Sequence, residues 1–242
     1  CIRDRLINHD SKCIKGDEIV TLGSLATENA DIVIDAAGLV VSPGFIDLHV
    51  HLEPIFDLLD CESHLRQGVT TSLGGPDGRG PLPFGIYLDS LAQLGVGMNV
   101  GFLVGHNSVR QNVMKLDDRE PTQEELDQMK KIISKSMAEG AFGISTGLKY
   151  LPGSFSKVDE LIELSKEVSK QGGIYTSHLR DEGLDVISSV KEAITISEKA
   201  NIPVILTHHK VIGKPTWGKS NETLALVDAA LNKGLDIKID QY

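Results

Sequence analysis

Two histidines, His49 and His51, lie one residue apart at the end of the apolar segment GFIDLHVHLE, residues 44–53. The apolar side chains of this segment predict a β-strand. Residues i and i+2 of a strand share a face, so the two imidazoles emerge side by side with Asp47 below them. This arrangement favours a pair of metal ligands over an unusual polar surface.

Most of the other histidines also follow apolar segments. Six of the eight histidines lie at the ends of predicted strands: His49, His51, His106, His178, His208 and His209. Imidazoles and carboxylates are the usual ligands of zinc, and a zinc ion with an open coordination position acidifies water and polarises a carbonyl. The pattern therefore indicates metal-assisted hydrolysis, although His178 and His208 could also be hydrogen-bonded core residues. His209 alternates with His208 and is expected to face helices instead.

These side chains require a scaffold of repeated strands and helices. Apolar, glycine-bounded segments predict strands at 44–51, 69–75, 97–105, 141–147, 173–179, 202–210 and 236–242. Helices are predicted at 123–139, with a capping box of Thr122 and Glu125, at 157–171, with Ser156 as N-cap, and at 184–200 and 221–233. Alternation of this kind predicts a parallel sheet and an α/β barrel, whose active site lies at the carboxyl ends of the strands.

The ends of the sequence differ from the repeated part. Residues 1–40 predict short strands, with alternating Ile32 and Ile34 half-buried. Seven barrel strands are counted where a (β/α)8 barrel has eight, and residue 1 is not methionine. We therefore expect a fragment that ends in or after the seventh strand.

The composition excludes several classes of partner. The net charge is −10 and no basic stripe is present, so nucleic acid is not expected as a partner. No apolar stretch reaches the length of a membrane span, and the three cysteines lack metal-site spacing. A cytoplasmic protein acting on a small molecule is the default expectation.

Several longer motifs carry a resemblance to a known family. They are VSPGFIDLHVHLE (41–53), QGVTT (67–71), AFGISTGLKYLPG (141–153), YTSHLRDE (175–182), THHKVIGKPTWGKS (207–220) and DIKIDQY (236–242). The chain resembles the amidohydrolase superfamily and, within it, the N-acyl-D-amino-acid deacylases, or D-aminoacylases. The resemblance implies part of a small β-sandwich at 1–42, a metal-bearing barrel at 43–242 that is incomplete at its C-terminus, and hydrolysis of N-acyl-D-amino acids.

The resemblance also implies a zinc site with one or two ions. Asp77, His178 and His208 match the ligands of the tightly held zinc, and His49 and His51 match a second, weaker position. Better-known members have cysteine in an NCG context where this chain has Asp77 in PDG. An aspartate can ligate zinc through oxygen, but it is also a common turn residue, so both interpretations of Asp77 stay open.

Three further residues match positions that face the substrate. Tyr150 and Lys210 correspond to groups that hold the carboxylate of the D-amino acid, and Tyr242 corresponds to a third such position. The resemblance places the general base, an aspartate, and a substrate-binding arginine beyond Tyr242. The catalytic base is therefore unassigned in this sequence, and residues 1–242 alone are expected to be inactive. The alternative is a truncated, non-catalytic homologue that retains a partial metal site.

Overall fold

The computed structural model describes residues 2–4, 11–23, 30–36 and 39–241, so the predicted role of Tyr242 lies outside the described residues. The chain divides into two compact units, residues 1–44 and residues 45–242. The candidate ligands His49, His51, Asp77, His178 and His208 all belong to the second unit.

The first unit contains a four-stranded sheet in the order β3-β2-β1-β4. Its strands are β1 (Ile2–Asp4), β2 (Ser11–Lys15), β3 (Glu18–Gly23) and β4 (Ile34–Ala36). Strand β2 pairs antiparallel with β1 and β3, whereas β4 pairs parallel with β1. The predicted half-burial of Ile32 and Ile34 is wrong, because their side chains are 72% and 54% exposed. Alternation predicted the strand, but no second layer covers it among the described residues of this unit.

The second unit is built on parallel strands that follow one another in sequence order. They are β5 (Phe45–Val50), β6 (Val69–Gly74), β7 (Asn99–Phe102), β8 (Val104–Gly105), β9 (Gly143–Gly147), β10 (Ile174–His178), β11 (Val204–Leu206) and β12 (Ile237–Ile239). Strands β7 and β8 are one predicted strand interrupted at Leu103, whose amide still bonds to the carbonyl oxygen of Gly74. Within the described residues, β5 and β12 each pair on one side only.

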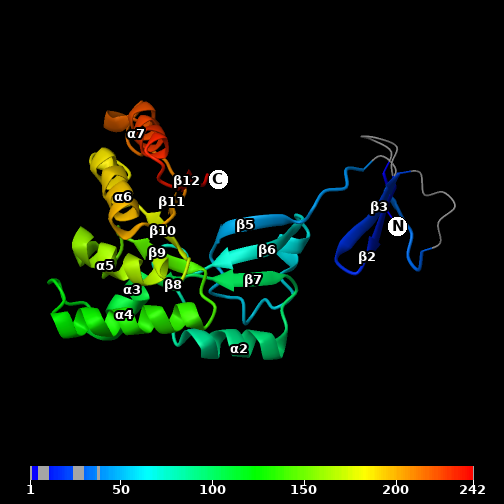
Figure 1. Ribbon diagram of the computed structural model, residues 1–242, viewed down its shortest axis with the longest axis horizontal. Helices are drawn as coiled ribbons and strands as arrows, with labels where there is room; N and C mark the ends of the chain where they lie inside the picture. Colours follow the sequence, from blue (N-terminus) through cyan, green and yellow to red (C-terminus); the bar gives the residue numbers. More distant parts are fainter. Residues whose placement is uncertain (1, 5–10, 24–29, 37–38, 242) are drawn as a thin grey trace. The chain divides into compact units, whose positions relative to one another are not determined.

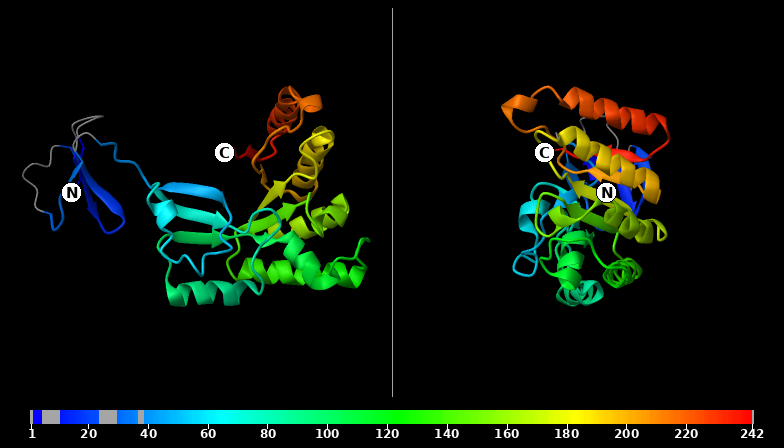
Figure 2. Two further views of the ribbon diagram at one scale, coloured as in Figure 1. Left: turned by 180° about the vertical axis from the view of Figure 1, so that it is seen from behind. Right: turned by 90° about the vertical axis from the view of Figure 1, so that its left-hand side faces the viewer.

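Helices connect these strands. They are α1 (Glu62–Leu65), α2 (Phe84–Leu94), α3 (His106–Met114), α4 (Gln123–Ala138), α5 (Val158–Ser169), α6 (Val186–Ala200) and α7 (Ser220–Asn232), with single 3₁₀ turns η1 (Gly153–Phe155) and η2 (Lys214–Thr216). Helices α3 to α7 pack against the five-stranded sheet β8–β12, whereas α2 lies beside the three-stranded sheet β5–β7 (Figures 1 and 2). No helix in the described residues combines the length and the apolar character that a membrane crossing requires.

The helix ends test the predicted capping residues. The capping box of α4 is present: the Thr122 hydroxyl accepts a bond from the Glu125 amide, and the Glu125 carboxylate accepts one from the Thr122 amide. The N-cap predicted for α5 is wrong by one residue. Helix α5 begins after Lys157, and the Ser156 hydroxyl instead donates a bond to the carbonyl oxygen of Gly153, which closes the preceding turn.

The core lies between the five-stranded sheet and its helices. Ile144, Tyr175 and Leu206 on the strands pack with Met129 and Ile196 on helices, and all five are almost fully buried. Strand β5 is different, because Phe45, Ile46 and Leu48, which point to both of its faces, are all exposed. The helix layer therefore holds the five-stranded sheet in place, whereas β5 has little cover among the described residues.

Candidate metal centre

The candidate ligands gather at the carboxyl ends of the parallel strands. His49 lies in β5 and His178 ends β10, whereas Asp77 and His208 lie in the loops after β6 and β11. Parallel strands bring their carboxyl ends to the same edge, which is why residues far apart in sequence meet here.

Two of these residues have an unusual backbone. Asp77 and His208 both have positive φ, 55° and 39°, a region that non-glycine residues enter at a cost of about 1–3 kcal/mol. The Asp77 turn is held from below by the Ser145 hydroxyl, which accepts a bond from the Gly78 amide at 3.1 Å and donates one to the carbonyl oxygen of Gly75 at 2.6 Å. The His208 amide donates to Asp240 Oδ1. Surrounding contacts thus hold both residues in conformations that turn them toward one another.

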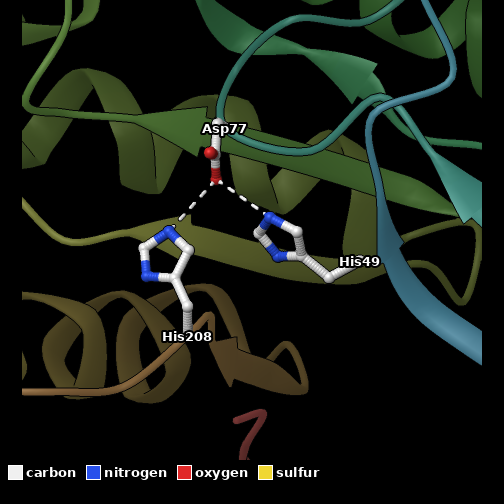
Figure 3. Close-up of side chains that lie close together, drawn as sticks. All are labelled: His49, Asp77 and His208. Carbon is white, nitrogen blue, oxygen red and sulfur yellow. Dashed lines mark ion pairs between the residues drawn. The ribbon is translucent and has the colours of Figure 1, made fainter. Parts of the chain in front are cut away.

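The Asp77 carboxylate lies between four imidazoles. Its Oδ1 is 3.7 Å from His49 Nε2 and 3.6 Å from His208 Nε2, as Figure 3 shows. Its Oδ2 is 3.5 Å from His51 Nε2 and 3.6 Å from His178 Nδ1. Each carboxylate oxygen therefore faces one histidine in or just after β5 and one in or after a later strand.

These separations suit ligands of a common ion better than hydrogen bonds. Hydrogen bonds between nitrogen and oxygen are rarely longer than about 3.2 Å. Two ligands on one tetrahedral zinc, each about 2.0–2.1 Å from the metal, lie about 3.4 Å apart. In addition, His49 Nδ1, Asp77 Oδ1, His178 Nδ1 and Asp240 Oδ2 are buried without a hydrogen-bond partner in the part of the chain that the structure describes. Buried polar atoms without partners are costly, so this donor set fits a bound cation.

The electrostatics of the centre point the same way. Burial by itself would raise the pKa of the Asp77 carboxyl, but His178, His208 and His49 outweigh burial and hold that pKa well below its usual range. Burial would likewise lower the pKa of His208, but Asp77 and Glu182 outweigh it and raise that pKa to about 9. Asp77 is therefore an anion at neutral pH and attracts positive charge, whereas His208 must release its proton before it can act as a metal ligand.

Glu182 is a member of the centre that sequence reasoning missed. Its Oε1 is 3.0 Å from His208 Nδ1 and accepts a bond from Lys210 Nζ at 2.7 Å. His208 thus has Glu182 on one ring nitrogen and Asp77 on the other. His178, Glu182 and His208 also offer ligand atoms within 4.8 Å of one another. The sequence offered one signal for this residue, because Glu182 follows His178 by four residues in the segment HLRDE.

The predicted substrate-facing residues line the same hollow. Tyr150 and Lys210 border a cavity of about 1000 Å³ together with Asp77, His178 and Asp240. The Tyr150 ring is 4.7 Å from the ring of His178, and burial, Asp77 and Glu182 raise the pKa of Tyr150. The Tyr150 hydroxyl is therefore neutral and can donate a hydrogen bond into the cavity.

The remaining histidines of the strand ends point elsewhere. His209 is buried on the helix side, as expected, with Nε2 2.9 Å from the Thr223 hydroxyl. His106 is also buried, with Nε2 2.8 Å from Glu160 Oε1 on α5. Asp240, which follows β12, faces the centre instead and has Oδ2 3.7 Å from His49 Nδ1.

Comparisons with known proteins show which family the chain resembles over most of its length. Residues 32–215 match the amidohydrolase family. The chain is 36% identical to the D-aminoacylase of Alcaligenes xylosoxydans xylosoxydans over 95% of its own length and 52% of that protein. It superposes on a crystal structure of a D-aminoacylase with a TM-score of 0.91 at 34% identity, covering 97% of this chain and 54% of the other.

A second solved structure is similar to nearly the same extent. It is the N-acyl-D-glutamate deacylase from Bordetella bronchiseptica, complexed with zinc and a phosphonate inhibitor that mimics the tetrahedral intermediate of its reaction. The TM-score is 0.88 at 31% identity, with 93% of this chain and 52% of that chain covered. The chain spans about half the length of the curated relatives it matches. The expected α/β barrel-type fold is confirmed by these structures.

Proposed function

The chain belongs to the amidohydrolase family, and on that premise we propose that the protein hydrolyses the amide bond of N-acyl-D-amino acids with the help of zinc. The products are a carboxylate and a free D-amino acid. The observation that carries the proposal is the placement of one buried carboxylate, Asp77, between four imidazoles at the mouth of a cavity. Relatives named for this activity support the choice of substrate class.

The resemblance groups Asp77 with His178 and His208 and sets His49 and His51 apart, but the distances favour a different first set. His49 and His208 would hold an ion with Asp77 Oδ1. Asp77 Oδ2 would remain available to a second ion together with His51 or His178. A divalent ion at either position supplies a Lewis acid that polarises the acyl carbonyl and makes water a better nucleophile. Asp77 would thereby act as a shared ligand rather than only as a turn residue.

Tyr150 and Lys210 would hold the carboxylate of the substrate. Lysine offers a compact positive charge and a neutral tyrosine offers one donor, which together suit a carboxylate. Lys210 is already positioned by its 2.7 Å bond to Glu182, and it lines the same cavity as Tyr150, Asp77 and His178. A substrate whose carboxylate met these two residues would place its adjacent amide in the cavity that Asp77 and the histidines line.

The proposal is tested by assaying the full-length protein against N-acetyl-D-amino acids and their L-enantiomers. We expect turnover of the D-substrates, loss of turnover after removal of metal with a chelator, and recovery on adding zinc. A protein that binds zinc at this centre but turns over none of these substrates would favour the non-catalytic alternative. A protein that binds no zinc would contradict both.

Glu182 gives a second test of the same centre. Because its carboxylate lies beside His208 Nδ1, it orients the ring so that Nε2 faces Asp77, and such partners are typically worth about 10–100-fold in metal affinity. We expect Glu182→Gln to weaken zinc binding roughly 10-fold in a competition assay with a chromophoric chelator. Glu198→Gln, an equal change on an exposed position of α6, serves as the control. Equal zinc affinities for both variants would remove Glu182 from the centre.

A further inference from the structure

A buried asparagine joins the two loops that carry Asp77 and Tyr150. Asn107 lies in the first turn of α3 and is only 4% exposed. Its Nδ2 donates to the carbonyl oxygens of Gly147 at 3.0 Å and Tyr150 at 3.3 Å, while its Oδ1 accepts from the Gly147 amide at 3.3 Å. The side chain therefore makes its hydrogen bonds to the end of β9 and the loop that follows, and not to its own helix.

The same side chain is packed against the Asp77 turn. A β-carbon built on Gly78, the residue after Asp77, would lie 2.1 Å from Asn107 Oδ1, and one built on Gly153 would lie 2.5 Å from it. A β-carbon on Gly147 would lie 2.1 Å from the carbonyl oxygen of Asp77. Only glycine permits such close approach, so the two loops interlock around one carboxamide.

The backbone reinforces this junction. Ser108 follows Asn107, and its backbone amide donates a hydrogen bond to the carbonyl oxygen of Gly78 at 3.1 Å. The first turn of α3 thus bonds to the Asp77 turn through its backbone and to the Tyr150 loop through Asn107. A hydrophobic side chain could fill this space, but it could not make the two bonds to Gly147 at the end of β9 and the one bond to Tyr150.

We propose that Asn107 is a positioning residue that sets the place of Tyr150 relative to Asp77, and so matches the centre to substrates that carry a carboxylate next to the scissile amide. This inference rests on the proposed function, because the role of Tyr150 comes from it. Asn107 itself touches neither the substrate nor a metal ligand side chain; it acts through the loop 147–153. Its removal should therefore disturb substrate binding more than the chemical step.

The sharpest variant is Asn107→Asp in the full-length protein. It keeps the size of the side chain and the acceptor for the Gly147 amide, but it places an oxygen where Nδ2 donates to Gly147 and Tyr150. We expect KM for N-acyl-D-amino acids to rise roughly 10-fold, with kcat changed less than about 3-fold, since lost donor bonds weaken binding by about this order. Zinc content should be unchanged. Amide hydrogen exchange in 147–153 should accelerate, while the strands keep their protection.

Asn112→Asp is the matched control, because Asn112 is an exposed asparagine on the same helix. It should change neither KM nor the exchange of 147–153. The positioning role would be overturned if amide hydrogen exchange in the Asn107→Asp variant became faster along the whole chain. It would also be overturned if the variant lost kcat at unchanged KM. Should the unaltered protein turn over no N-acyl-D-amino acid, the proposed function fails separately. Local exchange in 147–153 then still decides whether Asn107 joins the loops: acceleration there supports the junction, and its absence overturns it.

Discussion

Replacing Asp77 with alanine should empty the centre of zinc. The carboxylate oxygens of Asp77 lie within 3.7 Å of all four candidate histidines, so its removal takes a ligand from both proposed ion positions at once. Partners that only orient a ligand are worth roughly 10–100-fold in affinity, so the loss of a shared ligand should exceed about 100-fold. Zinc measured by atomic emission after dialysis should fall to background, and hydrolysis of N-acetyl-D-amino acids should fall with it.

Two further variants make the Asp77 experiment decisive. Asp77→Cys should retain or tighten zinc, because a thiolate is a good zinc ligand in the position that better-known members give to cysteine. Asp89→Ala makes the same change on an exposed position of α2 and should keep the zinc content of the unaltered protein. If Asp77→Ala kept its zinc as well, Asp77 would be only a turn residue.

Replacing Lys210 with methionine should weaken the binding of substrates that carry a free carboxylate. A hydrogen bond to a charged group is worth about 1.5–3 kcal/mol, so KM should rise about 10–100-fold. Substrate amides that lack the carboxylate should be much less sensitive, because they make no ion pair with Lys210. The pattern is read from kcat/KM for an N-acetyl-D-amino acid and for its amide.

Lys149→Met is the matched control for the lysine experiment. Lys149 lies next to Tyr150, but it extends toward Asp181, 3.8 Å away, and does not line the cavity. We expect its KM to change less than about 3-fold on either substrate. Equal losses on acid and amide in Lys210→Met would show that Lys210 acts through Glu182 and His208, its neighbours in the structure, and not on the substrate carboxylate.

The sequence predicts the strands better than it predicts the contacts between the loops that follow them. Each glycine-bounded apolar segment from residue 44 onward contains a parallel strand. Burial on both faces explains the continuous apolar signature of strands such as β9 and β10, whereas β5 has the same signature but is exposed. The side-by-side placement of His49 and His51 follows from the period of a strand. The exposed Ile32 and Ile34 show the limit of this reasoning, since alternation reports a strand but not what covers it.

The residues that sequence reasoning missed act through tertiary contacts. Glu182 follows His178 by four residues, yet its partners His208 and Lys210 lie in a different loop. Asn107 shares no motif with Gly147 or Tyr150, and its contacts exist only once β8 and β9 are paired. Roles of this kind depend on which loops meet, and spacing along the chain does not contain that information.

The distribution of the ligands along the chain has a kinetic consequence. His49 lies in β5 and His208 in the loop after β11, with Asp77 and His178 between them in sequence. Contacts between residues so distant in sequence form late in folding, because the loop-closure entropy is lost before the contacts can compensate for it. The ion therefore meets a complete set of ligands only after the strands have assembled. Zinc uptake during refolding should therefore appear as a late phase. Zinc binding would then report that the strands have assembled, and zinc would not nucleate their assembly.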